Sequence, residues 1–229
     1  MTPRLTCLAF LACLLPASPA AAQIPPNATD LRLYTGLHAA AAKGDAAEVA
    51  SLAAAGAKLE DKDARGRTAL HIATHRGHRD TVRALVKAGA NPNALDGQRY
   101  DIVTIAAVAN DVPMLKLAIE LGCSPGAITS PYDGTALIAA AHLGHAEVVR
   151  TLIAAGAPLD HVNNLGWTAL IESILLGPGD AEHTSTLEAL VKAGANTSLA
   201  DRSGATPLTL ARDRNYAGMV RILEAAGAK

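Results

Sequence analysis

Apolar residues recur along the chain at helical spacing, in short segments that end at glycine. Clear examples are Val82, Leu85 and Val86, and later Val148, Val149, Leu152 and Ile153. Spacings of three and four residues place such side chains on one face of a helix. A shorter segment precedes each of these, in which a threonine is followed two positions later by leucine and then by small residues. The pattern predicts pairs of short helices, in which the second helix carries the larger apolar groups.

The pairs repeat with a fixed period, which two separate markers reveal. Gly-Ala or Gly-Cys pairs begin at Gly56, Gly89, Gly122, Gly156, Gly194 and Gly227. The residues that open the shorter segments are Thr35, Thr68, Asp101, Thr135, Thr168 and Thr206. Both series advance mostly by 33 or 34 positions, with one step of 38 in each. A helix pair of this size cannot bury its apolar face alone, so neighbouring units must stack into a solenoid.

Each marker has a physical role in the unit. Threonine at the start of the first helix can accept from exposed backbone amides, and glycine after the second helix can adopt the left-handed conformation that ends it. Residues 23–31, with two successive prolines, read as a short extended lead-in. The repeats are predicted at residues 32–62, 63–95, 96–128, 129–162, 163–200 and 201–229.

The unit resembles the repeat of the ankyrin family. The resemblance rests on the stretch from Asp63 to His71, on Gly77-His78, and on the helix that ends in Gly-Ala-Asn at Asn91. It covers nearly all of residues 32–229. It implies an all-α solenoid of about six helix-turn-helix repeats joined by β-turn or hairpin loops. It also implies that the ring of His71 bonds to the backbone of the neighbouring turn.

Two repeats depart from the family pattern. In repeat three, Asp101 replaces the threonine that opens the first helix and can still cap it, and Pro113 suits the first turn of the second helix. Repeat five holds about five extra residues around Gly177–Thr184. We expect this insertion to lengthen the turn between the two helices of that repeat.

The first 22 residues have the layout of a secretory signal peptide. A basic Arg4 precedes an apolar run of eleven residues, and small residues lead to an A-x-A ending at Ala22. A lipoprotein signal acylated at Cys13 is the alternative. Cleavage after Ala22 predicts a periplasmic or secreted protein with no membrane insertion. Cys123 is then the one thiol left, so no internal disulfide can form.

Charge and motifs point away from several functions. The chain has 20 Lys and Arg against 21 Asp and Glu, so nothing indicates a nucleic-acid partner. It contains no glycine-rich phosphate loop, CxxC or GxSxG motif, so we expect no catalytic residues and no cofactor. Cys123 is expected to be a small buried packing residue. Glu172 replaces an apolar residue and is expected to be partly exposed beside the insertion.

Four of the eight histidines are explained by the resemblance. His71 and His38 occupy one template position, and His78 and His145 occupy another. His75 instead falls at a variable position on the exposed side of the first helix, as does His142. A surface contact is the favoured interpretation for both, and no metal site is predicted, because a tetrahedral site needs further ligands.

The resemblance implies a protein partner that contacts the loop tips and the exposed side of the first helices. The predicted partner-binding residues are Arg65, Arg67, His75, Arg76, Tyr100, His142, Leu143, Trp167, Leu175 and Leu176. The same mapping includes Gln98, Val108, Leu165, Arg202 and Arg214. Trp167 is the favoured anchor. Alternatively, Trp167, Leu175 and Leu176 pack against the insertion.

The leading hypothesis is therefore a monomeric, non-catalytic scaffold in the periplasm or outside the cell. Exported relatives of this type are associated with protection from oxidative stress or with neutralising toxins. Two alternatives remain. One is a metal- or peroxide-handling protein that uses His75, His142 and Cys123, and the other is an effector delivered into a host cell.

Overall fold

A computed structural model describes residues 23–229, so the predicted signal peptide lies outside the described residues. Within this part the chain forms helices and no strand, apart from one isolated bridge between Thr129 and Gly134. The helices are α1 (Ala28–Leu33), α2 (Gly36–Lys43), α3 (Ala46–Ala54), α4 (Ala69–His75), α5 (Arg79–Lys87), α6 (Ile102–Val108), α7 (Val112–Glu120), α8 (Ala136–His142), α9 (Ala146–Ala154), α10 (Ala169–Leu175), α11 (Ala181–Lys192), α12 (Pro207–Asp213) and α13 (Ala217–Ala225).

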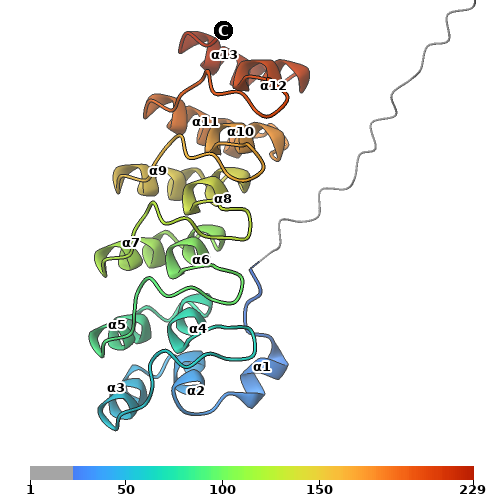
Figure 1. Cartoon of the computed structure of the whole chain (residues 1–229). Coiled ribbons are helices and arrows are strands. Elements are labelled where there is room, and N and C mark those ends of the chain that lie inside the picture. Colours follow the sequence, from blue (N-terminus) through green and yellow to red (C-terminus); the bar gives the residue numbers. More distant parts are fainter. Residues whose placement is uncertain (1–22) are drawn as a thin grey trace, which may run out of the picture.

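After α1 the helices form stacked antiparallel pairs, which confirms the predicted all-α solenoid (Figure 1). The first helices of the pairs, α2, α4, α6, α8, α10 and α12, form one row, which we call the inner row. The second helices, from α3 to α13, form the outer row. Long loops connect the pairs along one side of the stack. None of the described helices has the length and apolarity needed to cross a bilayer.

The helix caps predicted from the sequence are present in most repeats. The side chains of Thr135, Thr168 and Thr206 accept hydrogen bonds from the backbone amides three residues later, and Asp101 does the same in repeat three. Thr35 makes no side-chain cap. Pro113 lies in the first turn of α7, where its missing N–H leaves no bond unmade.

A continuous apolar core runs between the two rows of helices. Leu70, Leu85, Leu137 and Leu152 are buried in it, and alanines of the inner helices fill the narrow spaces. Small side chains allow the inner helices to lie close together, while the outer helices supply bulk. The core is therefore shared between neighbours rather than closed within one repeat, as a solenoid requires.

The loops between pairs also stack on one another. In repeat two the amide of Asp63 donates to the carbonyl of Arg67, which closes the loop at 2.9 Å. The amide of Gly97 in the next loop donates to the carbonyl of Arg65 at 3.1 Å. Gly66 has φ 74°, and a Cβ there would lie 2.6 Å from the Gly97 nitrogen, so only glycine permits this close approach.

Side chains at the start of four outer helices tie their pair to the pair before it. Nε2 of His78 bonds the carbonyl of Ala42 at 3.2 Å, and Nδ1 of His145 bonds that of Ala107 at 3.0 Å. The same contact is made in the last two repeats by His183, to the carbonyl of His142, and by Tyr216, to that of Gly177. His183, inside the insertion, thus takes over a template role that the sequence did not reveal.

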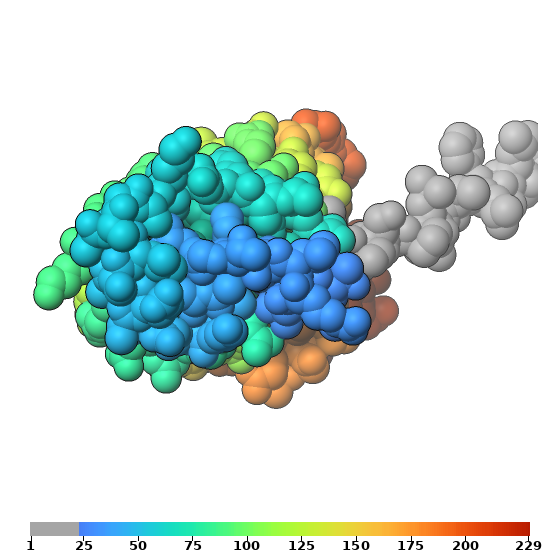
Figure 2. Space-filling view, turned by 90° about the horizontal axis from the view of Figure 1, so that it is seen from below, coloured from blue at the N-terminus to red at the C-terminus, as the bar shows by residue number. Residues whose placement is uncertain are grey.

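One prediction about local structure was wrong. The lead-in is not extended throughout, because residues 28–33 form α1, capped by the side chain of Asn27. The insertion in repeat five lengthens the turn between its two helices, as predicted, and it also lengthens the second helix. Helix α11 has 12 residues where α9 has 9, so three of the extra residues extend the helix and the remainder enlarge the turn. Figure 2 views the solenoid from its N-terminal end, with α1 lying beside the first repeat.

Candidate partner-binding face

The predicted site residues lie along two lines that follow the solenoid, one through the stacked loops and one through the C-terminal ends of the inner helices. Arg65, Tyr100 and Trp167 lie in the stacked loops, whereas His142 and Leu175 end inner helices. Helices α4, α6, α8, α10 and α12 have seven residues each, so the two lines are about 10 Å apart. We call this surface, made of the loop tips and the C-terminal ends of the inner helices, the partner face.

An exposed apolar patch lies on the partner face around repeats four and five. Its members, Ile128, Leu143, Val162 and Leu165, are between 37% and 51% exposed. They are four of the six large apolar side chains that are exposed among residues 23–229; the other two, Ile24 and Leu33, belong to the N-terminal segment. The positions of Leu143 and Leu165 were mapped from the sequence. We refer to these four residues as the apolar patch.

Ile128 and Val162 were missed by the sequence reasoning. Each lies immediately before the first residue of a loop. The residues at the equivalent places are Lys62, Leu95 and Ala200. This variation was the available signal, because a position that accepts Lys, Ala and several large apolar residues is not fixed by the packing of the repeat.

Trp167, Leu175 and Leu176 border the apolar patch but are half-buried. Trp167 and Leu175 both pack against the core cluster. The Trp167 backbone is fixed by its own amide, which donates to Oδ1 of Asn163 at 3.0 Å. Part of the surface of these side chains is therefore accessible to a partner, and the rest is buried within the protein.

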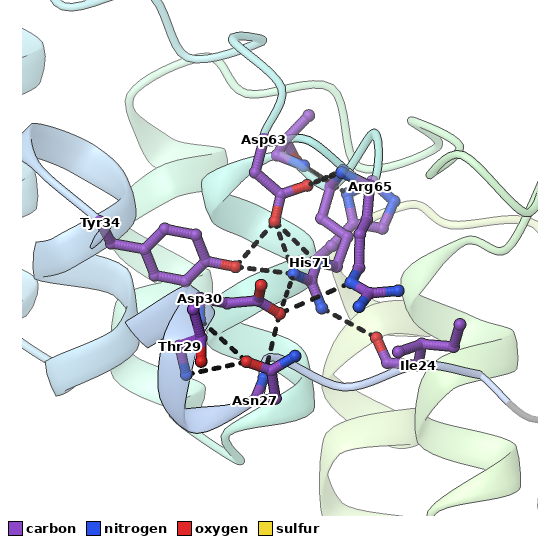
Figure 3. Close-up of polar contacts among 10 residues, drawn as sticks. Ile24, Asn27, Thr29, Asp30, Tyr34, Asp63, Arg65 and His71 are labelled. Atoms are coloured by element: carbon purple, nitrogen blue, oxygen red, sulfur yellow. Dashed lines mark hydrogen bonds and ion pairs between the residues drawn. The ribbon is translucent and has the colours of Figure 1, made fainter. Parts of the chain in front are cut away.

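Arg67 was predicted to contact a partner, but its side chain is only 1% exposed. Asp30, Tyr34 and Asp63, which bond to it, lie close together (Figure 3). Nη1 donates to the carbonyl of Ile24 at 2.9 Å, and Nη2 donates to Asp30 at 2.8 Å and to the hydroxyl of Tyr34 at 2.9 Å. Nε donates to Asp63 at 2.8 Å. The N-terminal segment has folded over this position, so Arg67 holds that segment instead of a partner.

The electrostatics of this cluster favour the charged forms of all three ionic groups. Burial alone would raise the pKa of Asp63, but hydrogen bonds from Arg67, from Tyr34 and from backbone amides lower it to about 2. The hydrogen bond from Arg67 also lowers the pKa of Asp30. Burial acts to lower the pKa of Arg67, and its two carboxylate partners more than offset this and raise it. Burial and Asp63 together raise the pKa of Tyr34.

Tyr100 is the second predicted contact that the structure places inside. Its amide donates to Oδ1 of Asp96 at 2.9 Å, and its carbonyl accepts from the Asp96 amide. The carbonyl also accepts from Nε2 of His71. These bonds hold the end of the loop against the inner helices, and the tyrosine side chain is buried there.

His71 and His75 have different environments. Nε2 of His71 lies 3.0 Å from the carbonyl of Ala94 and 3.2 Å from that of Tyr100, which confirms the expected bonding to the neighbouring turn. His75 is half-buried, and its Nε2 is buried without a hydrogen-bond partner among the described residues. Burial, with Arg67 and His71 nearby, lowers the pKa of His75 to about 4. It is therefore neutral at pH 7.

Glu172 is buried, and the prediction of partial exposure was wrong. Its side chain is 5% exposed, and Oε1 accepts a hydrogen bond of 2.7 Å from Nδ2 of Asn163. Oε2 lies 3.3 Å from Nδ1 of His142. Oδ1 of Asn163 in turn accepts from the amides of Leu165 and Trp167. The carboxylate thus joins both lines of the partner face and supports the loop that carries Leu165.

Cys123 behaves as a packing residue. It is buried, and its Sγ donates to the carbonyl of Pro92 at 3.2 Å. Burial raises the pKa of the thiol to about 12, so it is not a nucleophile at neutral pH. Across residues 23–229, no three His, Cys, Asp or Glu side chains come together as a metal site would require.

Comparisons with known proteins agree with this architecture. A family model described as ankyrin repeats (3 copies) matches residues 8–96 and 103–181. The chain is 36% identical over 98 residues to the ankyrin repeat protein YahD of Escherichia coli (strain K12), a match that covers 42% of this chain and 49% of that protein. The chain therefore spans about half the length of this curated relative.

Two solved structures are similar over most of the chain. An ankyrin repeat domain from Acinetobacter baumannii AYE has a TM-score of 0.79 and 41% identity, and the match covers 84% of this chain and 98% of that one. The ankyrin repeat domain of Bcl-3, a member of the IkappaB protein family, has a TM-score of 0.78 and 27% identity, with 86% and 87% covered.

Proposed function

The chain belongs to the ankyrin-repeat family, and from this premise we propose that it is a non-catalytic scaffold that binds another protein in the periplasm or outside the cell. Ankyrin-repeat domains generally serve protein–protein interaction. We propose that the protein acts as a monomer, in protection from oxidative stress or in neutralising a toxin.

The apolar patch is the observation that carries the proposal. Ile128, Leu143, Val162 and Leu165 expose apolar surface on neighbouring loops and helix ends of this face. Exposed apolar side chains that gather on one face mark interaction sites, because their burial against a partner is favourable. The half-buried Trp167 beside them supplies the aromatic group that is enriched at the centre of interfaces.

Export is supported by the sequence of residues 1–22, which has the charge, apolar run and small-residue ending of a signal peptide. Cell fractionation with an antibody against the protein tests this part. Recovery of a shortened chain from the periplasm or medium is expected, and a full-length chain in the cytoplasm would contradict it.

The metal- or peroxide-handling alternative gains no support from the described residues. Cys123 is buried and His75 is half-buried, so neither presents an open ligand or a reactive thiolate. Delivery into a host cell remains an alternative that the fractionation experiment distinguishes, because it requires the protein in the host extract.

Binding is tested by immobilising the chain that begins at Gln23 and exposing it to a periplasmic extract of the source organism. A specific protein should be captured by the wild type and lost when Leu143→Ser and Leu165→Ser are combined. Leu33→Ser is the matched control, because Leu33 is also exposed but lies in α1. Equal capture by the wild type and the double variant would refute the assignment of the partner face.

A further inference from the structure

Basic side chains lie on the partner face at both ends of the apolar patch. At the loop tips and inner-helix ends of repeats one, two and six the chain places Lys43, Lys62, Arg65, Arg76, Arg202 and Arg214. Carboxylates lie there too. Asp63, Asp96 and Asp201 each open a loop and accept a hydrogen bond from a backbone amide of that loop. Asp133 is paired with Arg99 at 3.0 Å, and Asp213 ends α12. The positive charge that a partner can meet therefore depends on which basic side chains the fold leaves unpaired.

The basic groups differ in how far the fold already uses them. Arg214 donates to the carbonyl of Leu175, and Arg202 donates to that of Asn164. Arg76 is exposed, and its side chain makes no hydrogen bond or ion pair with another residue in the described part of the chain. Arg65 is exposed and meets a carboxylate only at 3.6 Å. The available positive charge is therefore in repeat two.

The N-terminal segment illustrates what this end of the face binds. Oδ2 of Asp30 lies 2.8 Å from Nη2 of Arg67 and 3.6 Å from Nε of Arg65 (Figure 3). A carboxylate on a backbone segment that passes the loops is thus already accommodated there. Asp30 is bonded mainly to the buried Arg67, which leaves the outer side of Arg65 and all of Arg76 for an external carboxylate.

We propose that the partner face takes a segment of another protein in which Asp or Glu residues accompany a group of apolar residues. The apolar residues would cover the apolar patch, and the carboxylates would meet Arg65 and Arg76. This inference rests on the proposed function and specifies the chemistry of its partner. Electrostatic complementarity of this kind fixes the direction in which a segment lies and speeds its association.

The spacing between the two parts of the site follows from the repeat. Helices pack 8–10 Å apart, so two to three repeat steps from repeat two to repeats four and five correspond to roughly 20–30 Å. An extended chain advances about 3.3 Å per residue. The carboxylates should therefore lie about six to nine residues from the apolar group.

Two labelled synthetic peptides of about 15 residues test the inference by fluorescence anisotropy. Both carry Leu, Phe and Leu in one half, and the other half carries glutamates in one peptide and lysines in the other. The glutamate peptide should bind about tenfold more tightly at low salt, and the difference should shrink at about 0.5 M salt. Combining Arg65→Glu with Arg76→Glu should remove this preference. Lys116→Glu should leave it intact, because Lys116 is exposed on the outer helix α7.

The outcomes separate this inference from the proposed function. Equal binding of the two peptides, preference for the lysine peptide, or binding of neither would overturn the inference. The capture experiment with Leu143→Ser and Leu165→Ser judges the partner face independently of charge. A natural partner that depends on the apolar patch but ignores Arg65 and Arg76 would preserve the proposed function and refute the inference.

Discussion

The buried carboxylate of Glu172 accepts a hydrogen bond of 2.7 Å from the side-chain amide of Asn163. Asn163 opens the loop of repeat five and accepts from the amides of Leu165 and Trp167. The equivalent residue of α4 is Ile72, and that of α6 is Ile105; both are buried apolar residues. An acidic side chain therefore replaces an apolar one in the core, and through Asn163 it orients the loop that carries Leu165.

Glu172→Ala should destabilise the protein by about 1–3 kcal/mol, because the Asn163 amide is left buried without its acceptor. Glu172→Gln should cost less, since its side-chain carbonyl can still accept that hydrogen bond. Urea denaturation measures both. Trp167 fluorescence reports the loop, and its emission should shift in the alanine variant. Glu120→Ala is the control, because Glu120 is exposed and pairs only with Arg83 at 3.4 Å. A similar small loss in all three variants would contradict the role of Glu172.

Arg67→Ala should cost about 3–5 kcal/mol, because it leaves the carboxylates of Asp63 and Asp30 without their buried partner. It should also release the N-terminal segment, which hydrogen exchange at residues 24–34 would detect. Arg76→Ala provides the comparison. It removes an exposed arginine and should change the free energy of unfolding by no more than about 0.5 kcal/mol. If the two variants lose a similar free energy of unfolding, Arg67 does not hold the N-terminal segment in place.

The protein should lose stability in acid over two different pH windows. The pKa of His75 is lowered to about 4 in the folded state from 6.5, so the unfolded chain binds more protons between these values. Stability must therefore fall as the pH drops from about 6.5 to 4. The pKa of Asp63, lowered to about 2, adds a further loss below pH 4, as its stabilising charge is removed.

His75→Gln removes the contribution of His75 to the upper window, to which the buried His71 also contributes because burial lowers its pKa. The variant should lose less stability than the wild type between pH 7 and pH 5, measured by denaturation at the two pH values. If the two proteins respond equally to this change of pH, the environment assigned to His75 is incorrect.

The Cys123 thiol should resist alkylation in the native protein and react at once in denaturant. Its burial and its pKa of about 12 both suppress the thiolate that performs the reaction. A disulfide exchange reagent that absorbs light on reaction measures both rates in the chain that begins at Gln23. Rapid reaction in the native state would restore the peroxide-handling alternative.

Much of the fold was predictable because its signals are local. The threonine caps, the glycines after the outer helices and the apolar spacing each act within a few residues, and their period places every helix pair. The bonding of His71 to the next turn followed from the family resemblance and is confirmed.

The state of individual side chains on the partner face was decided by contacts between distant segments. Arg67 is buried because residues about 30 to 40 positions earlier fold over it. No local sequence pattern near Arg67 predicts that the N-terminal segment packs there. Glu172 is buried because Asn163 and His142 both supply polar groups beside it. The sequence by itself determined the repeat, its helices and the positions that form the partner face. Only the tertiary structure decided which of those positions are exposed, because burial depends on which neighbour is stacked against each one.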